Sequence, residues 1–176
     1  MDLMLDLETL STRPDAVILT FGAVKFDPYT RVIDNQGLYL RVDVDEQILL
    51  DRHVDDATIE WWGNQVPEVR DEALGDENRV SLDNFTQQLN RYLVGVKSIW
   101  AQGPVFDIVI LENLYRQIKK PAPWYYWQIR DSRTLFGVHG DPRVKGREGH
   151  HNALSDCIYQ AQGIQEIYKK FDIKKE

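Results

Sequence analysis

The chain has 176 residues, of which 43% are hydrophobic and 28% are charged. This length and balance are typical of one soluble globular domain that buries its own core. The net charge of −7 argues against a protein that coats nucleic acid through basic charge alone. The charge still allows an enzyme whose acids hold metal ions that meet a phosphodiester.

Two features bear on the compartment. The chain has one cysteine, Cys157, so it cannot form an internal disulfide, and this fits a reducing environment. No apolar run is long enough to span a membrane, and the first residues lack the charged and long apolar regions of a signal peptide. We therefore expect a cytoplasmic protein without a membrane partner.

The first part of the chain predicts three strands. Leu3, Leu5 and Leu7 recur with the period of two that is typical of a strand. Residues 17–26 and 32–42 are rich in β-forming residues, and the turn signal "DPYT" separates them. The short links between these strands favour an antiparallel meander.

The rest of the chain predicts helices that alternate with short strands. Apolar residues recur at helical spacing over residues 56–66, 67–74, 81–96, 104–120 and 152–171. Short strands are predicted over residues 98–101 and 124–132, and a long loop over residues 136–151. This order predicts a single α/β domain over residues 1–176, with a central mixed five-stranded sheet flanked by helices.

Two acids stand inside the first predicted strand. Asp6 and Glu8 are two residues apart, so their side chains point to one face, opposite that of the leucines. Solvated surface acids are the ordinary interpretation of such a pair. In a central strand, however, two carboxylates about 4 Å apart repel by roughly 4 kcal/mol at an effective dielectric of about 20. A hard divalent cation between them relieves this repulsion, so the pair predicts a metal site.

A site for two metal ions needs further carboxylates. Asp107 lies in the first turn of a predicted apolar helix, where the helix dipole alone could account for an acid. Asp156 borders the apolar stripe of the last helix, and His151 precedes it by five residues. Each residue has an ordinary structural explanation by itself, but together they indicate an acidic metal-binding cluster beside a histidine.

The order of these residues resembles the three motifs of the DEDDh 3′–5′ exonucleases, which have the ribonuclease H-like fold. "DLET" at residues 6–9 resembles the first motif, Phe106 and Asp107 resemble the second, and "HNALSD" at residues 151–156 resembles the third. The resemblance spans nearly the whole chain and is particularly close to a small stand-alone subgroup of bacteria and phages.

Two details qualify the match. Many family members carry His-Asn shortly before the second-motif acid, where this chain has Gln102 and Gly103. The substrate-binding loop therefore departs from the family pattern, while the metal motifs keep it. Two histidines, His150 and His151, precede the last helix, and the family spacing selects His151.

The resemblance implies a metal-dependent 3′–5′ exonuclease that uses two divalent ions, Mg²⁺ or Mn²⁺. Asp6, Glu8, Asp107 and Asp156 would be the metal ligands, and Asp6 would serve both ions. His151 would be the general base that takes a proton from the attacking water, since histidine titrates near neutral pH. The product would be a nucleoside 5′-monophosphate released from the 3′ end of DNA or RNA.

Substrate contacts are also predicted. Thr9 and Leu10 resemble family positions that contact the terminal nucleotide, and Phe106 either does the same or belongs to the core. Trp61 and Trp62 are adjacent on a helix, so at most one can stack on a base while the other packs. We assign the stacking role to Trp61.

The loop before His151 carries several cations, including Arg143, Lys145 and Arg147. A loop of this kind either closes over the substrate or is simply a solvated surface segment. We predict that Arg147 contacts the substrate.

Two alternative functions stay open. One is a catalytically silent nucleic-acid-binding or scaffold domain of the same fold, and the other is a metal-dependent endonuclease. The intact set of four acids and a histidine favours catalysis, because binding alone does not require it. The expected partners are nucleic-acid 3′ ends, single-stranded or in 3′ overhangs, and the stand-alone relatives imply a possible homodimer. The choice between DNA and RNA depends on contacts to the 2′-OH, which the sequence does not reveal.

Overall fold

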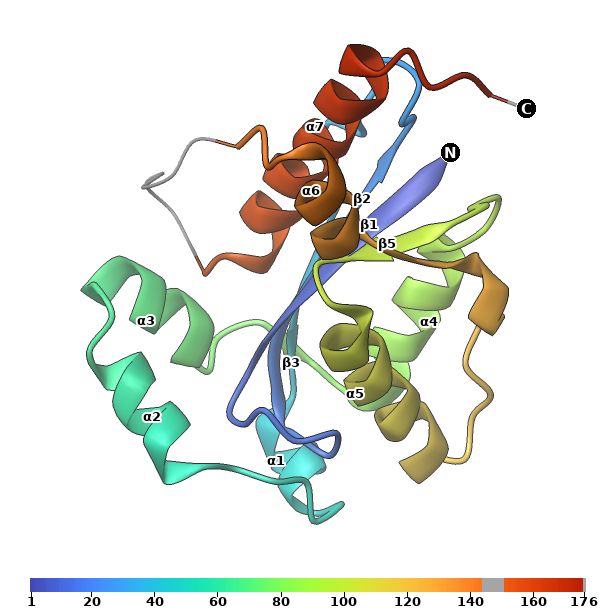
Figure 1. Cartoon of the computed structure of the whole chain (residues 1–176). Helices are drawn as coiled ribbons and strands as arrows, with labels where there is room; N and C mark the ends of the chain where they lie inside the picture. Colours follow the sequence, from blue (N-terminus) through green and yellow to red (C-terminus); the bar gives the residue numbers. More distant parts are fainter. Residues whose placement is uncertain (144–150, 176) are drawn as a thin grey trace.

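The computed structural model describes residues 1–143 and 151–175 (Figure 1). Its centre is a six-stranded sheet in the order β4-β3-β2-β1-β5-β6. The strands are β1 (Asp2–Thr9), β2 (Ile18–Phe26), β3 (Leu38–Val42), β4 (Arg79–Val80), β5 (Ile99–Ala101) and β6 (Ile129–Asp131). The β1, β2 and β3 strands pair antiparallel, whereas β5 pairs parallel with both β1 and β6, and β4 pairs parallel with β3. The sheet is therefore mixed, and the predicted meander forms one half of it.

Helices cover both faces of this sheet. In the described part of the chain they are α1 (Val44–Ile48), α2 (Asp56–Gly63), α3 (Pro67–Leu74), α4 (Leu82–Tyr92), α5 (Pro104–Gln117), α6 (Ser132–His139) and α7 (Ala153–Lys170). The α4 and α5 helices lie on one face, and α6 and α7 lie on the other (Figure 1). Within the described ranges, no helix combines the length and apolar character that a membrane crossing requires.

The alternation of β1 sorts its side chains between the two layers. Leu3, Leu5 and Leu7 are buried in the cluster that contains the apolar faces of α4 and α5. Met4 is buried on the other face, in the cluster formed with α6 and α7. Because strand side chains alternate, Asp6 lies on the same face as Met4. The acids of β1 therefore face α7, as the period of two predicts.

Several predicted boundaries were wrong, and one strand was missed. The sheet has six strands rather than five, because the two residues of β4 pair with β3. A strand of two residues has too short a pattern to be recognised in a sequence. The last strand begins only at Ile129, after the 3-10 turn Tyr126–Gln128, and the third begins only at Leu38.

Helices α1 and α6 were also missed. The α6 helix occupies Ser132–His139, part of which was predicted as a loop because of its glycines. Asp131 caps this helix, since its carboxylate accepts a hydrogen bond from the Arg133 amide at 3.0 Å. Gly137 lies inside the helix with no atom near the position that a Cβ would take. This glycine therefore lowers helix propensity without breaking the helix.

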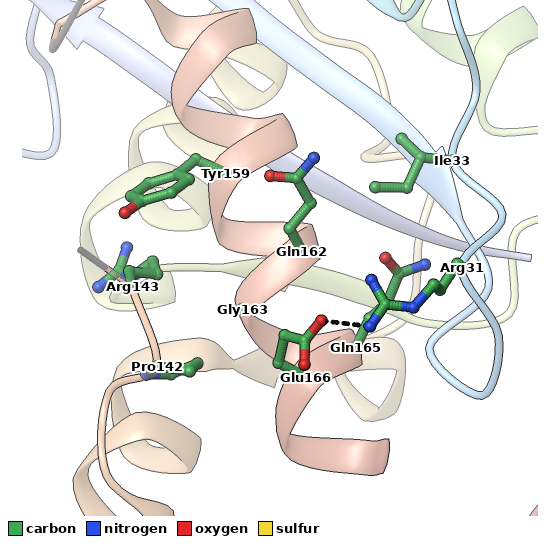
Figure 2. A pocket seen from close by; sticks show the side chains of 9 residues that line it. All are labelled: Arg31, Ile33, Pro142, Arg143, Tyr159, Gln162, Gly163, Gln165 and Glu166. Carbon is green, nitrogen blue, oxygen red and sulfur yellow. Dashed lines mark hydrogen bonds and ion pairs between the residues drawn. The ribbon is translucent and has the colours of Figure 1, made fainter. Parts of the chain in front are cut away.

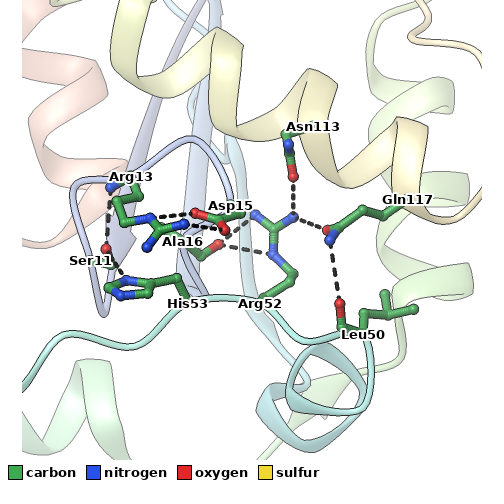
Figure 3. Close-up of polar contacts among 9 residues, drawn as sticks. All are labelled: Ser11, Arg13, Asp15, Ala16, Leu50, Arg52, His53, Asn113 and Gln117. Atoms are coloured by element: carbon green, nitrogen blue, oxygen red, sulfur yellow. Dashed lines mark hydrogen bonds and ion pairs between the residues drawn. The ribbon is translucent and has the colours of Figure 1, made fainter.

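A buried arginine holds the loop that follows β1 (Figure 3). Arg52 is 3% exposed, and its Nε donates to the carbonyl oxygen of Ala16 at 2.9 Å. Its Nη1 donates to Asn113 Oδ1 at 3.1 Å and to Gln117 Oε1 at 2.6 Å, both on α5. Buried charges need such partners. The arginine thereby ties the loop between β1 and β2 to α5, the helix that carries Asp107.

Candidate active site

Three carboxylates meet where β1 lies against the start of α7. Asp6 and Glu8 come from β1, and Asp156 comes from the first turn of α7. One oxygen atom of each carboxylate lies within 4.8 Å of the others. Glu8 is only 9% exposed. The structure therefore brings together three of the acids that the sequence selected.

A glycine allows α7 to approach the sheet this closely. Gly22 of β2 pairs directly with Asp6 in the antiparallel ladder. A Cβ atom at Gly22 would lie 2.3 Å from the carbonyl carbon of Ala153, the first residue of α7. The Cys157 thiol also donates to the Gly22 carbonyl oxygen at 3.3 Å. The missing side chain at Gly22 thus lets Asp156 reach the acids of β1.

Asp107 reaches the same strand from the opposite layer. It is 4% exposed in the first turn of α5, and its Oδ1 accepts a hydrogen bond from the Leu7 amide at 3.1 Å. Gly103, with φ of 109°, turns the chain from β5 into α5, and this backbone conformation favours glycine. The Leu7 amide lies between Asp6 and Glu8, so the fourth acid borders the cluster.

Burial and mutual repulsion act on the protonation of these acids. Burial raises the pKa of Glu8 to about 8, and the charges of Asp156 and Asp107 add to this rise. Burial also raises the pKa of Asp6 well above its usual range, with added repulsion from its three acidic neighbours. Burial raises the pKa of Asp107 to about 7, against the hydrogen bond from Leu7. An apolar setting with repelling charges disfavours the ionised forms.

The start of α7 places His151 beside the cluster. The backbone amide of His151 donates to Asp156 Oδ2 at 2.9 Å, and His151 has a positive φ of 67°. Its imidazole ring lies 4.8 Å from the ring of Trp61, at an interplanar angle of 89°. Asn152 caps the helix, accepting from the Ser155 amide at 3.0 Å. The histidine thus lies between Asp156 and a tryptophan of α2.

A cavity of about 420 Å³ opens next to Glu8. It lies within the size range of small-ligand pockets. Its lining combines β1, α2, α5 and the loop after β1: Leu7, Glu8, Thr9, Thr12, Ala57, Thr58, Trp61, Trp62 and Phe106. Three aromatic side chains line it together with one carboxylate of the cluster. The cavity can therefore hold a flat ring beside the acids.

The predicted substrate-binding residues do not all lie together. Thr9, Trp61 and Phe106 line this cavity. Leu10 is 8% exposed and packs in a core cluster that includes Trp62. Arg147 lies outside the described residues. Their contacts with substrate stay predictions.

The two adjacent tryptophans take different positions. Trp62 is 1% exposed, and its Nε1 donates to the Thr9 carbonyl oxygen at 2.9 Å. Trp61 is 41% exposed. Only Trp61 is therefore open enough to offer a large part of its ring to a ligand.

A second cavity, of about 320 Å³, lies on the outer side of α7 (Figure 2). Arg31 and Glu166 form an ion pair at 2.8 Å across one part of it. Arg143 lies at another part, with its guanidinium 4.4 Å from the Phe136 ring centroid, and it donates to Gln102 and Asp141. None of the four clustered acids lines this cavity, so it is separate from the candidate site.

The residues of the cluster fit a hard divalent cation. The donors are carboxylate oxygens, which Mg²⁺ and Mn²⁺ prefer. Buried acids that repel one another are stabilised in their ionised forms by a cation between them. The amide of Gln160, 6% exposed on α7, also donates to Asp6 Oδ1 at 3.2 Å. This donor supports an ionised Asp6, as a metal ligand requires.

The sequence profile described as the Rv2179c-like 3′-5′ exoribonuclease domain matches residues 1–168. The chain belongs to this family. The prediction of a DEDDh-type 3′–5′ exonuclease is thereby confirmed at the level of enzyme class. The family match also favours an exonuclease over the silent scaffold and the endonuclease.

A curated relative agrees with this assignment. The exonuclease is 28% identical to the exodeoxyribonuclease of enterobacteria phage T4 over 159 residues, which cover 76% of this chain and 69% of the phage protein. This relative is named for DNA, whereas the family description names RNA.

Solved nuclease structures share the fold. Cell-death related nuclease 4 has a TM-score of 0.66 at 16% identity, over 96% of this chain and 63% of that protein. The nuclease domain of 3′hExo, a DEDDh family member solved with rAMP, has a TM-score of 0.65 at 14% identity, over 96% and 91% of the two chains. Exonuclease X, solved with a 5′-overhanging DNA duplex, has a TM-score of 0.53 at 16% identity, over 99% of this chain and 95% of that chain. The predicted ribonuclease H-like fold is confirmed.

Two residues that shape the candidate site were not predicted from the sequence. Gln160 stands four residues after Asp156, and this spacing places both on one face of α7. That spacing was the only signal for Gln160, because glutamine is also common on the solvent-exposed faces of helices. Gly22 had no signal, because the approach of α7 to β2 is a tertiary contact.

Proposed function

We propose that this exonuclease removes nucleotides from the 3′ ends of DNA or RNA in a metal-dependent reaction that releases nucleoside 5′-monophosphates. The observation that carries the proposal is the close approach of carboxylate oxygens of Asp6, Glu8 and Asp156, within 4.8 Å of one another. Asp107 also accepts a hydrogen bond from the Leu7 amide, between the two acids of β1. The family match supports the reaction class. Two divalent ions fit the number of carboxylates.

The acids would divide between two cations. Asp6 would serve both, Glu8 and Asp156 would complete one site, and Asp107 would serve the other. The bound cations would neutralise charge on the scissile phosphate and leaving oxygen and lower the pKa of the attacking water. Gln160 holds the Asp6 carboxylate in place by its amide hydrogen bond.

His151 would take the proton from the attacking water. A general base must lie within reach of the reacting atoms, and the amide bond to Asp156 anchors this residue beside the cluster. The edge-to-face packing against Trp61 orients the imidazole ring. The cavity beside Glu8 would hold the terminal base among Thr9, Trp61 and Phe106.

A labelled-strand assay tests this function. We expect 3′-labelled single strands to release labelled mononucleotide at the first time points, while 5′-labelled strands shorten one nucleotide at a time. Matched DNA and RNA strands identify the preferred sugar, and a circular single strand should stay intact. Cleavage of the circle, or activity that persists after removal of divalent metal, would contradict the proposal.

Metal binding should raise the melting temperature more at pH 8 than at pH 5. The pKa values of Glu8 (about 8) and Asp107 (about 7) in the fold exceed the unfolded values near 4. Between about pH 4 and pH 8 and without metal, the folded state keeps protons that the unfolded state has lost. The free energy of unfolding therefore falls as pH rises through this range. Cations compete with these protons, and their binding strengthens with pH.

The expected size of the shift follows from linkage. A cation at about 100 times its Kd adds roughly 2.7 kcal/mol, which raises the melting temperature of a domain of this size by about 5–10 °C. Thermal melts with Mg²⁺ or Mn²⁺ measure this shift, and K⁺ at equal ionic strength is the control. A shift that is absent, or equal at both pH values, would contradict a carboxylate metal site.

A further inference from the structure

A cavity of about 390 Å³ lies at the opposite end of β1 from the acids. It begins at Asp2, the first residue of β1, whereas Glu8 lies near the end of that strand. Six residues of extended strand separate these ends by about 20 Å. The cavity is therefore distinct from the metal cluster and from the cavity beside Glu8.

Positive charge dominates the lining of this cavity. Four cations line it, against the single carboxylate of Asp2: Lys97, Arg130, Lys174 and Lys175. Lys174 forms an ion pair with Asp172 in the adjoining turn, whereas no ion pair among the described residues involves the other three cations. The chain as a whole carries a net charge of −7. A concentration of cations in such a chain indicates an anionic ligand.

Three exposed aromatic residues, outside the cavity lining, closely precede Arg130 in the chain. Tyr125, Tyr126 and Trp127 are 63%, 84% and 56% exposed. The rings of Tyr125 and Trp127 are stacked, with centroids 4.4 Å apart and an interplanar angle of 4°. The Arg130 guanidinium joins the two features, since its Nη1 donates to the Trp127 carbonyl oxygen at 2.7 Å while the residue lines the cavity.

Cations beside stacked, exposed aromatic rings are the combination that binds single-stranded nucleic acid. The cations bind phosphates, and unpaired bases stack on the outer faces of the aromatic rings. Protein interfaces are also enriched in tyrosine, tryptophan and arginine, but they are depleted in lysine. Three lysines among the four cations therefore favour nucleic acid. We call the four cations and the three exposed aromatic residues the basic aromatic surface.

We propose that the basic aromatic surface binds single-stranded nucleic acid at a distance from the carboxylate cluster. The identification of this ligand as the substrate strand rests on the proposed function, but the binding itself does not. At about 3.4 Å per stacked nucleotide, the roughly 20 Å along β1 correspond to about six nucleotides. Long strands can therefore contact both sites, whereas a dinucleotide cannot.

Two sets of substitutions test this proposal. The first is Y126A with W127A, which removes exposed rings, and the second is K97Q with K175Q, which removes charge. The matched control is R91Q with R116Q, which changes charge equally at exposed positions outside the cavity. Fluorescence anisotropy with a labelled single strand of about 15 nucleotides, in chelator and without divalent metal, measures binding without turnover.

Each set has its own expected result. The aromatic variant should raise Kd about tenfold or more with an unchanged salt slope, because stacking carries no counterion release. The lysine variant should weaken binding and reduce the slope of log K against log salt by about 0.7 for each lost phosphate contact. The control should bind like the wild type. In metal, both test variants should raise KM for the long strand and leave dinucleotide hydrolysis unchanged.

Other outcomes would overturn the proposal. Wild-type affinity in both test variants would exclude this surface as a nucleic-acid site. A change of oligomeric mass in the variants, with nucleic-acid affinity unchanged, would assign the surface to a protein interface instead. Failure of the proposed function would give a different result. The wild-type protein would then hydrolyse no strand in metal, while its binding of single strands in chelator would still depend on these residues.

Discussion

Replacing Asp6 by asparagine should abolish hydrolysis and leave the fold intact. The amide side chain of D6N has the same size as the carboxylate and can still accept the hydrogen bond from Gln160. The substitution removes the carboxylate that two cations would share. We expect kcat to fall by about 10³-fold or more, because loss of an outer-shell partner alone costs about 10–100-fold. The labelled-strand assay measures this loss.

The same substitution should not destabilise the metal-free protein. Asp6 is surrounded by Asp107, Glu8 and Asp156, and burial with their repulsion raises its pKa. A neutral amide removes that repulsion, so the melting temperature at pH 8 should match or exceed that of the wild type, and the metal-induced rise should disappear. D76N is the matched control, since the Asp76 side chain is fully exposed. Wild-type activity in D6N would contradict the site.

Replacing Gly22 by alanine should destabilise the fold strongly. The added Cβ would lie 2.3 Å from the backbone of Ala153, and neither β2 nor the start of α7 can move without loss of packing. Overpacking of a tight core costs about 3 kcal/mol or more in such a case, which lowers the melting temperature by about 6–12 °C in a domain of this size. Thermal unfolding measures this change.

Activity should fall with G22A as well, because the displaced helix carries Asp156 and follows directly after His151. Gly63 offers the matched control. It is the last residue of α2, and a Cβ there would meet no atom within 4 Å. G63A should therefore leave stability unchanged or raise it by up to about 1 kcal/mol. Equal stability of G22A and the wild type would mean that α7 does not depend on this close contact.

The local pattern of β1 was sufficient to predict that Asp6 and Glu8 share one face of the sheet. The period of two in a strand is a property of the backbone itself, so Leu3, Leu5 and Leu7 had to face one layer and Asp6 and Glu8 the other. The meander and the helices near residues 104–120 and 152–171 follow from equally local rules. The selection of His151 with Asp156 rested instead on the resemblance to the third motif of the family.

Short or irregular elements escaped prediction because local signals are weak there. The two residues of β4 are a strand only because β3 lies beside them, and the α6 helix forms despite its glycine because Asp131 caps it. The pairing partner of β4 is known only once the chain is folded, since it depends on where a distant segment lies. The Asp131 cap is local to the sequence, but the glycines that follow it favoured a loop.

The arrangement of the site itself depends on contacts between distant segments. The close approach at Gly22 brings Asp156 to Asp6, and the bond from the Leu7 amide draws Asp107 to β1 across 100 residues of chain. The residue types and their local faces were therefore readable from the sequence. Packing decided the distances between these residues, the partner of each side chain and the raised pKa values of Asp6, Glu8 and Asp107. Desolvation and repulsion exist only once separate elements share one buried space.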